Sequence, residues 1–300
     1  MSALESVLAA MIRTATPLLL AGLGELVTER AGVINIGLEG AVICGALAAT
    51  VAAPPLGVAG GYLSALVAGA AVGVLMATFV VVLRADQIIS GTAVALLGLG
   101  LTGALYHDIY GAGGVALTVP TSRSFDIPVL SGVPVLGPAL FQQPLMSYMA
   151  FLLAPALAWF LYRTHAGLSL RAVGEAPHAA RAAGVAVDRF RVGAIIFGSA
   201  LGGAAGGVLV LAQSGTFAEG MSAGRGFIAI AIVALGRWTP TGVLVASLVF
   251  GFATAMQYVV QALGWPLRYE LVLTLPYVLT LVALVLAPRG AAPAYLARTD

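Results

Sequence analysis

The sequence predicts an all-α fold: a polytopic transmembrane helical bundle of about 8–10 spans, some of them discontinuous or re-entrant. Apolar residues make up 60% of the 300-residue chain and charged residues only 9%, whereas soluble domains are about a quarter charged. The mean hydropathy is +1.03. Long uncharged runs of membrane-spanning length occupy residues 40–83, 192–218, 238–267 and 271–288. These runs do not alternate in polarity, which argues against the strands of a membrane barrel.

The expected spans form one transmembrane domain over residues 1–300. They lie near residues 6–28, 33–53, 58–83, 87–106, 145–162, 192–213, 218–236, 241–262 and 271–287. The breaks between them fall at proline and glycine, as expected for turns: at Pro54-Pro55, in segment 111–144, at Pro240 and at Pro266. Glycine pairs four residues apart, such as Gly69/Gly73 and Gly202/Gly206, predict close backbone packing between helices.

Arginine placement predicts the orientation of the bundle. Five arginines lie in the polar interval 163–191, which the positive-inside rule assigns to the cytoplasm. Alternating the spans outward from this interval leaves the N-terminus on the outer side.

The composition also excludes several functions. All 14 basic residues are arginine, so the chain has no P-loop lysine, and any ATP hydrolysis belongs to another chain. The net charge of +2 gives no reason to expect nucleic acid as a partner. His107, His165 and His178 lie far apart without cysteine or acidic residues at metal-ligand spacing. We therefore expect no catalytic residue, metal or cofactor on this chain.

A polar stretch at residues 24–40 separates the first two apolar runs and holds three acids, one arginine and one asparagine. Intramembrane ionisable groups usually face a cavity or a partner. Asn35 and Glu39, four residues apart, are expected on one face of a discontinuous helix that lines a substrate cavity or gate. Hydrogen bonding between helices is the alternative for this pair. We expect Glu29 and Arg30 to form a solvated interfacial turn.

Segment 84–92 opens the fourth span with polar side chains that could bind a ligand. Gln87, Ser90 and Thr92 could donate or accept hydrogen bonds to a base or a ribose. Helix capping and interhelical bonding explain Ser90 and Thr92 equally well.

Segment 213–227 is Gly-rich and polar between two late spans, and we place it on the outer side or along the substrate pathway. Gln213 and Glu219 are its candidate polar contacts, and Phe217 could stack on a planar base. An aromatic side chain at a membrane interface is also ordinary.

The interval 163–191 is the candidate contact with another protein. Pro177 suits the first turn of a helix, and the alanines that follow favour a short helix that ends at Gly184. Ala180 and Gly184 leave one face of this helix small, so a partner could pack against it. An amphipathic helix lying on lipid headgroups is the alternative.

Residues 29–40, Glu-Arg-Ala-Gly-Val-Ile-Asn-Ile-Gly-Leu-Glu-Gly, resemble a signature of permease subunits in the branched-chain amino acid, sugar and nucleoside group of ABC importers. The form of residues 35–40 is similar to nucleoside-type permeases. Residues 167–185 resemble the coupling helix of these permeases, although Ala176 stands where the family usually has Asn. Segment 84–92 is also similar, with Asp86 where Asn is common. The resemblance runs from about residue 14 to 287.

The resemblance implies a multi-pass permease subunit of an ATP-driven importer in a bacterial plasma (inner) membrane, surrounded by membrane lipid. Its cargo would be nucleosides or related purine and pyrimidine compounds. A partner ATPase would bind ATP and Mg²⁺, a second homologous permease would complete a heterodimer, and an extracytoplasmic lipoprotein or periplasmic protein would deliver the substrate. The alternatives are a sugar or branched-chain amino acid permease of the same group, or a stand-alone secondary transporter.

The candidate site residues form two sets. The substrate pathway is expected to use Asn35, Glu39, Gln87, Ser90, Thr92, Gln213, Phe217 and Glu219. ATPase docking is expected to use Arg171, Gly174, Glu175, Pro177, Ala180, Arg181 and Gly184.

Overall fold

The computed structural model describes residues 3–111, 118–126, 137, 140–262, 274–275, 278, 281–282, 285 and 292–296. Its helices are α1 (Ala3–Arg30), α2 (Leu38–Ala77), α3 (Gln87–Tyr110), α5 (Leu145–Arg163), α6 (His165–Glu175), α7 (Pro177–Ala182), α8 (Val187–Val208), α9 (Arg225–Leu235) and α10 (Pro240–Ala262). Two π-helical segments, η1 (Thr78–Val82) and η3 (Leu209–Ser214), extend α2 and α8. The short strands β1 (Ser124–Asp126) and β2 (Gln142–Pro144) pair antiparallel at one end of the bundle.

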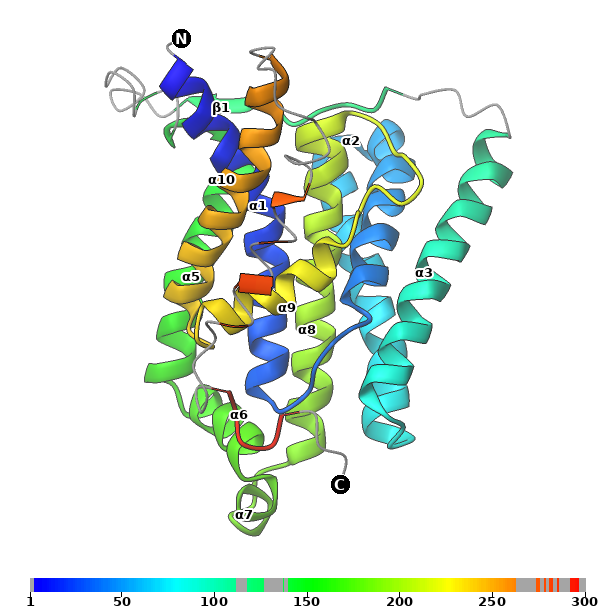
Figure 1. Ribbon diagram of the computed structural model, residues 1–300. Coiled ribbons are helices and arrows are strands. Elements are labelled where there is room, and N and C mark those ends of the chain that lie inside the picture. Colours follow the sequence, from blue (N-terminus) through cyan, green and yellow to red (C-terminus); the bar gives the residue numbers. More distant parts are fainter. Residues whose placement is uncertain are drawn as a thin grey trace.

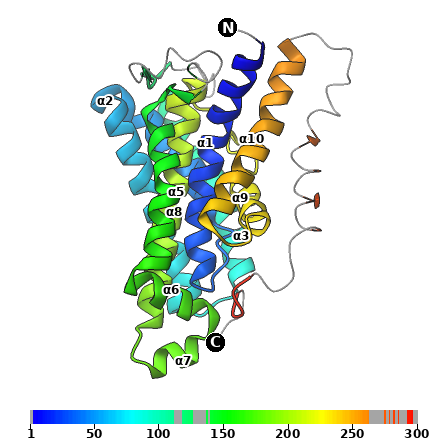
Figure 2. The ribbon, with the colours of Figure 1, turned by 90° about the vertical axis from the view of Figure 1, so that its left-hand side faces the viewer.

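Most of the long helices run along one axis, which confirms the predicted helical membrane bundle (Figure 1). Within the described residues, six helices are long and apolar enough to cross a membrane. The N-terminus lies at one end and α6 and α7 lie at the other, as Figures 1 and 2 both show. From the positive-inside rule we propose that the α6–α7 end faces the cytoplasm and that the N-terminal end is the outer end.

Helix α1 forms the centre of the bundle because it is apolar on nearly every side. It packs against α5, α8, α9 and α10, and Leu19, Leu23 and Leu26 are fully buried. Phe250 of α10 is also fully buried in the same core. A helix that is hydrophobic all round is expected to be buried by other helices.

Helix α2 contains the two predicted spans 33–53 and 58–83 as the arms of a hairpin. The chain reverses at Gly57, where φ is 71°, a value that glycine adopts without a steric penalty. The Ser64 hydroxyl then donates to the Ala48 carbonyl at 3.0 Å, which places the arms side by side. Pro54 and Pro55 lie at the end of the first arm, just before the reversal.

Helix α8 packs backbone to backbone against both arms of this hairpin. A Cβ atom added at Gly45 of the first arm would overlap Gly203 of α8, and one added at Gly69 of the second arm would overlap Ser199 and Gly203. Within lipid the hydrophobic effect does not drive helices together, so their association depends on close packing, which small residues allow. The predicted glycine packing is thus located at the α2–α8 contact.

The predicted span 218–236 is the main correction to the element order. Its helical part, α9, has only 11 residues, about 16 Å at 1.5 Å per residue, too short to cross a membrane. A turn-rich segment from Gly215 to Gly224 leads into it, and Figure 1 shows α9 in the middle of the bundle. This is a discontinuous element of the kind predicted. The expected span 271–287 lies largely outside the described residues.

Candidate functional site

The polar stretch between α1 and α2 is a break in the helices, buried inside the protein. The chain leaves the helix after Arg30 and re-enters it at Leu38, so Asn35 is not helical. The prediction that Asn35 and Glu39 share one helical face is therefore wrong. The sequence predicted a discontinuous helix here, but the break extends over Asn35 and only Glu39 is helical, and Gly32 turns the backbone at φ 85°.

Side chains from α1, α3 and α8 hold this break in place. The Asn35 backbone N–H donates to Glu25 Oε1 at 2.9 Å, and its side-chain Nδ2 donates to Ser199 Oγ of α8 at 2.9 Å. Gln87, at the start of α3, accepts from the Ile34 N–H at 3.0 Å. Asn35 and Gln87 thus support the backbone of the break.

Glu39 connects this break to the discontinuous helix α9. Its carboxylate accepts from the Gly224 N–H at 2.9 Å through Oε1 and from the Gly226 N–H at 2.7 Å through Oε2. The first N–H groups of a helix have no partner within that helix and carry its positive dipole end. Glu39 is only 3% exposed. It therefore caps α9 from another helix and fixes where α9 begins.

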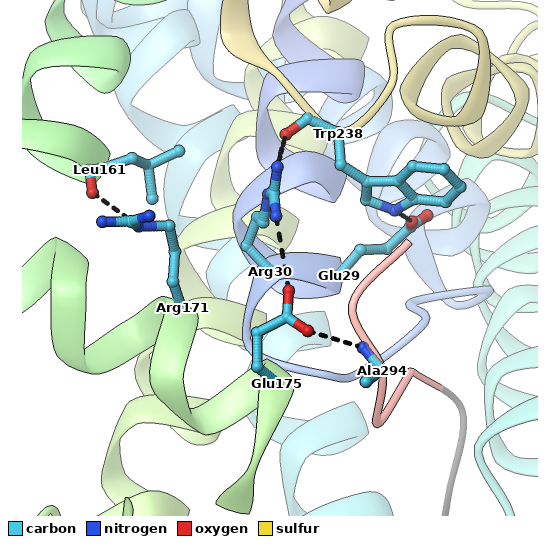
Figure 3. Close-up of polar contacts among 7 residues, drawn as sticks. All are labelled: Glu29, Arg30, Leu161, Arg171, Glu175, Trp238 and Ala294. Atoms are coloured by element: carbon cyan, nitrogen blue, oxygen red, sulfur yellow. Dashed lines mark hydrogen bonds and ion pairs between the residues drawn. The ribbon is translucent and has the colours of Figure 1, made fainter. Parts of the chain in front are cut away.

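The end of α1 holds the turn between α9 and α10 (Figure 3). Trp238 donates its indole N–H to Glu29 Oε2, and Arg30 Nε donates to the Trp238 carbonyl at 2.8 Å. Arg237 and Trp238 have φ values of 55° and 53°, a left-handed conformation that is uncommon outside glycine. Glu29 is 2% exposed. The expected solvated turn at Glu29 and Arg30 is therefore wrong, because Glu29 is buried against Trp238.

The same end of α1 contacts the C-terminal end of α6. A Cβ atom at Gly174 would overlap the Arg30 carbonyl, so the two backbones touch. Glu175 Oε1 lies 3.9 Å from Arg30 Nη1, and its Oε2 accepts from the Ala294 N–H at 3.0 Å. Arg171 donates Nε to the Leu161 carbonyl at 3.0 Å. Arg171 and Glu175 therefore bind other parts of the same chain (Figure 3), and the assignment of Arg171, Gly174 and Glu175 to ATPase docking stays a prediction.

Helix α7 has the predicted bounds but the opposite buried face. Pro177 occupies its first turn, Ala176 provides no side-chain cap, and Gly184 follows its end at φ 85°. Ala180 is 5% exposed and packs in a cluster with Val173 of α6 and Val187 of α8. The predicted small face at Ala180 is thus covered by the chain itself.

The exposed side of α7 is formed by the residues between these buried positions. His178 and Ala179 are exposed, as is Gly184 beyond the helix end. Arg181 is also exposed, and its Nη2 lies 3.4 Å from Asp188 Oδ1.

The remaining candidates are spread over α3 and the outer end. Ser90 is buried on α3, whereas Thr92 is exposed and donates to the Ile88 carbonyl of its own helix at 2.8 Å. Phe217 is 3% exposed, with its ring centroid 5.0 Å from that of Tyr106. Its ring therefore packs within the protein.

Two polar contacts tie the outer segment to its neighbours. Glu219 Oε1 lies 2.7 Å from His107 Nε2, with both side chains about half exposed. Gln213 donates Nε2 to the Arg13 carbonyl at 2.7 Å. These contacts join the segment before α9 to α3 and to α1.

An open cavity of about 600 Å³ lies beside Gln213 at the outer end. Its polar lining comes from α1, from η3 and from the start of α9: Ser6, Arg13, Thr14, Gln213, Ser214 and Arg225. Arg225 Nη1 donates to the carbonyls of Met221 and Ser222 at 2.8 and 3.1 Å, which orients the guanidinium. Arg13 and Arg225 are not among the site residues predicted from the sequence. The signal for both was an arginine beside a long apolar run.

Comparison with known proteins places these features in a family. Residues 7–285 match the family model described as branched-chain amino acid transport system / permease component. The chain is 39% identical to a putative glucose ABC transporter permease protein of Haloferax volcanii, over 88% of this chain and 80% of that protein.

Two further relatives carry names that refer to nucleosides. Identity is 36% to a guanosine ABC transporter permease protein of Bacillus subtilis, over 94% of this chain and 91% of that protein. It is 33% to a nucleoside ABC transporter permease protein of Lactococcus lactis, over 94% and 92%. No solved structure gives a significant match. The chain therefore belongs to the branched-chain amino acid transport system permease family, and it is a multi-pass ABC transporter permease of the plasma membrane.

Proposed function

We propose that this permease carries nucleosides or related purine and pyrimidine compounds into the cell, driven by ATP hydrolysis on a separate subunit. The observation that carries the proposal is the cap of Glu39 on α9 together with the polar outer cavity. A helix that starts inside the bundle, below an outward-facing cavity, is an arrangement that transporters use to bind cargo within the membrane.

The lining of the cavity favours a purine over a sugar. Arginine can donate two parallel hydrogen bonds to O6 and N7 of guanine, and its planar guanidinium can stack on an aromatic ring. Arg13 and Arg225 both line the cavity, together with the amide of Gln213. The glucose-named relative makes a sugar the second candidate. The hydroxyl groups of a sugar would use the serine and threonine side chains in the same lining.

Transport assays with a competition panel separate these cargoes. The chain would be co-expressed with its neighbouring ATPase, permease and receptor genes, and uptake of labelled guanosine measured against adenosine, uridine, glucose and leucine. We expect competition by nucleosides, and an Arg225→Gln variant should lower uptake about tenfold, the effect of about 1.4 kcal/mol. Arg123→Gln, at an exposed outer arginine, is the matched control. Uptake that only glucose or leucine inhibits would overturn the nucleoside assignment.

The ATPase is proposed to dock on the exposed side of α7, formed by His178, Ala179, Arg181 and Gly184. The absence of lysine from the chain supports a separate ATPase, because the phosphate-binding loop of such enzymes needs one. The contact of Gly174 with Arg30 then offers a mechanical route from α7 to α1 and Trp238. ATP and Mg²⁺ would bind the partner.

Co-purification tests this docking surface. Arg181→Glu should reduce the amount of ATPase that co-purifies, because a reversed charge opposes a complementary acidic site. Arg163→Glu is the control, since Arg163 is exposed at the same end but belongs to α5. Equal recovery of ATPase with both variants would refute the assignment. Intact-mass spectrometry of the subunits in the same complex would show whether a second, different permease is present, as we propose.

A further inference from the structure

An open groove of about 470 Å³ lies at the cytoplasmic end of the bundle and has no role in the function proposed above. Val27 of α1 forms part of its lining, with Leu157 and Phe160 from α5 and Phe190 and Phe197 from α8. Leu170 of α6 also lines the groove. The lining is therefore almost entirely aliphatic and aromatic.

The groove is open at this point because a glycine of α8, which has no side chain, lines it. Gly193 of α8 faces it, and a Cβ atom added there would meet nothing within 4 Å. A Cβ atom added at any other glycine of α8 would, in contrast, meet atoms of a neighbouring helix within 4 Å. The opening at Gly193 is therefore not needed for helix packing, and an apolar space of this kind does not hold water favourably.

A positive charge marks the groove as a site for an amphiphile. Among the described residues that line the groove, Arg189 is the charged one and none is acidic. The neighbouring Asp188 pairs with Arg181 at 3.4 Å. Arg189 is exposed at the cytoplasmic end, where the headgroups of the inner leaflet lie. Basic pockets between transmembrane helices on this side bind the headgroups of anionic lipids, and arginine binds phosphate through paired hydrogen bonds.

We propose that this groove binds one anionic phospholipid of the inner leaflet, with an acyl chain beside Gly193 and the phosphate on Arg189. The occupant joins α1, α5, α6 and α8 at one place, so it stabilises the helices that carry the cytoplasmic loop. A neutral lipid would fill the same apolar space without the charge interaction.

Native mass spectrometry of the full-length chain, purified with its importer partners, tests the proposal. After delipidation, phosphatidylglycerol or phosphatidylcholine is added, and bound lipid and melting temperature are measured. We expect phosphatidylglycerol to be retained and to raise the melting temperature more than phosphatidylcholine does. Gly193→Leu places a side chain in the groove at a position where a Cβ atom meets nothing within 4 Å, and Arg189→Gln removes the charge. Each should reduce retained phosphatidylglycerol about fivefold.

Two control variants make the result specific. Gly100→Leu adds the same side chain on α3, at another glycine whose Cβ would meet nothing within 4 Å. Arg163→Gln removes another exposed arginine from the cytoplasmic end. Both should retain wild-type lipid. Equal retention of the two lipids by wild type, or equal losses in test and control variants, would overturn the proposal. Cross-linking of residue 193 to a second permease or to the ATPase would overturn it as well.

Discussion

Replacing Glu39 by glutamine would test whether the charge on this side chain holds α9 in place, because length and shape are preserved. The Glu39 carboxylate accepts two backbone N–H groups, at 2.9 and 2.7 Å, and is 3% exposed. The amide of glutamine has one oxygen, so one N–H would face an NH₂ group instead of an acceptor. A hydrogen bond to a charged group contributes about 1.5–3 kcal/mol, and an unsatisfied buried donor costs about 1–3 kcal/mol. These two effects overlap, so we expect the substitution to reduce the free energy of unfolding by about 3 kcal/mol.

The assay combines thermal unfolding of the detergent-solubilised protein with uptake into proteoliposomes. Glu39→Gln should lower the melting temperature by on the order of 5 °C and reduce uptake strongly, because α9 no longer starts at a fixed depth. Glu39→Asp keeps the charge but shortens the reach, so it separates charge from geometry. Asp108→Asn is the control, at an exposed carboxylate of α3 to which no role is assigned. A Glu39→Gln protein with wild-type melting temperature and uptake would refute the capping argument.

The other predictions concern the junctions on either side of α9 and α6. Gly226→Ala should abolish uptake, because its Cβ would lie 2.5 Å from the backbone of the capping residue, whereas Gly100→Ala, in open space, should leave uptake unchanged. Gly174→Ala should push α6 away from α1, because its Cβ would overlap the Arg30 carbonyl. We expect the variant to co-purify with the ATPase but to hydrolyse ATP without transporting substrate. A variant with normal coupling would contradict the proposed route from α7 through Gly174 to α1. Arg30→Gln should lower the melting temperature more than Glu175→Gln. The Arg30–Glu175 pair is 3.9 Å long, and its Glu175 side chain is half exposed, so the pair contributes at most about 1 kcal/mol. Arg30 is only 13% exposed and also donates to the Trp238 carbonyl; glutamine at 175 keeps an oxygen that can accept from the Ala294 N–H. Equal losses in a double-mutant cycle would show that the ion pair dominates.

The sequence predicted the bundle well because a bilayer permits few folds. Backbone groups in lipid must be satisfied within helices, so long uncharged runs determine where most spans lie. The break predicted at Pro54-Pro55 lies next to the observed reversal at Gly57. Pro177 and Gly184 likewise bounded α7 correctly, because each acts through its own backbone.

The candidate site was less predictable because its contacts join distant parts of the chain. Glu29 and Trp238 are 209 residues apart, and Asn35 and Ser199 are 164 apart. Hydropathy suggested a solvated turn at Glu29, since a single sequence does not reveal a buried indole donor. The face of α7 was predicted wrongly for a similar reason. A helix of six residues is too short for periodicity to tell which side packs on its own chain.

The apolar length of residues 218–236 also misled the span prediction. Three glycines with positive φ, Gly215, Gly220 and Gly224, turn the backbone before α9 starts. Their spacing was visible in the sequence. The sequence did not show where the turns end and α9 begins, because that point is set by the Glu39 carboxylate, which accepts the first N–H groups of α9.

The glycine contact of α8 with both arms of α2 has a consequence for the transport cycle. Any sliding or rotation between these helices would drive backbone atoms into one another, because no side chains separate Gly203 from Gly45 and Gly69. The α2 hairpin and α8 should therefore travel as a single rigid frame while cargo passes. Amide hydrogen exchange along this frame should stay slow in every nucleotide state, and changes should concentrate in the turn before α9 and in the α9–α10 reversal. We therefore expect a rigid unit of α2 and α8, packed through glycine, and a mobile unit at α9 that Glu39 and Arg30 bind to the rest of the permease.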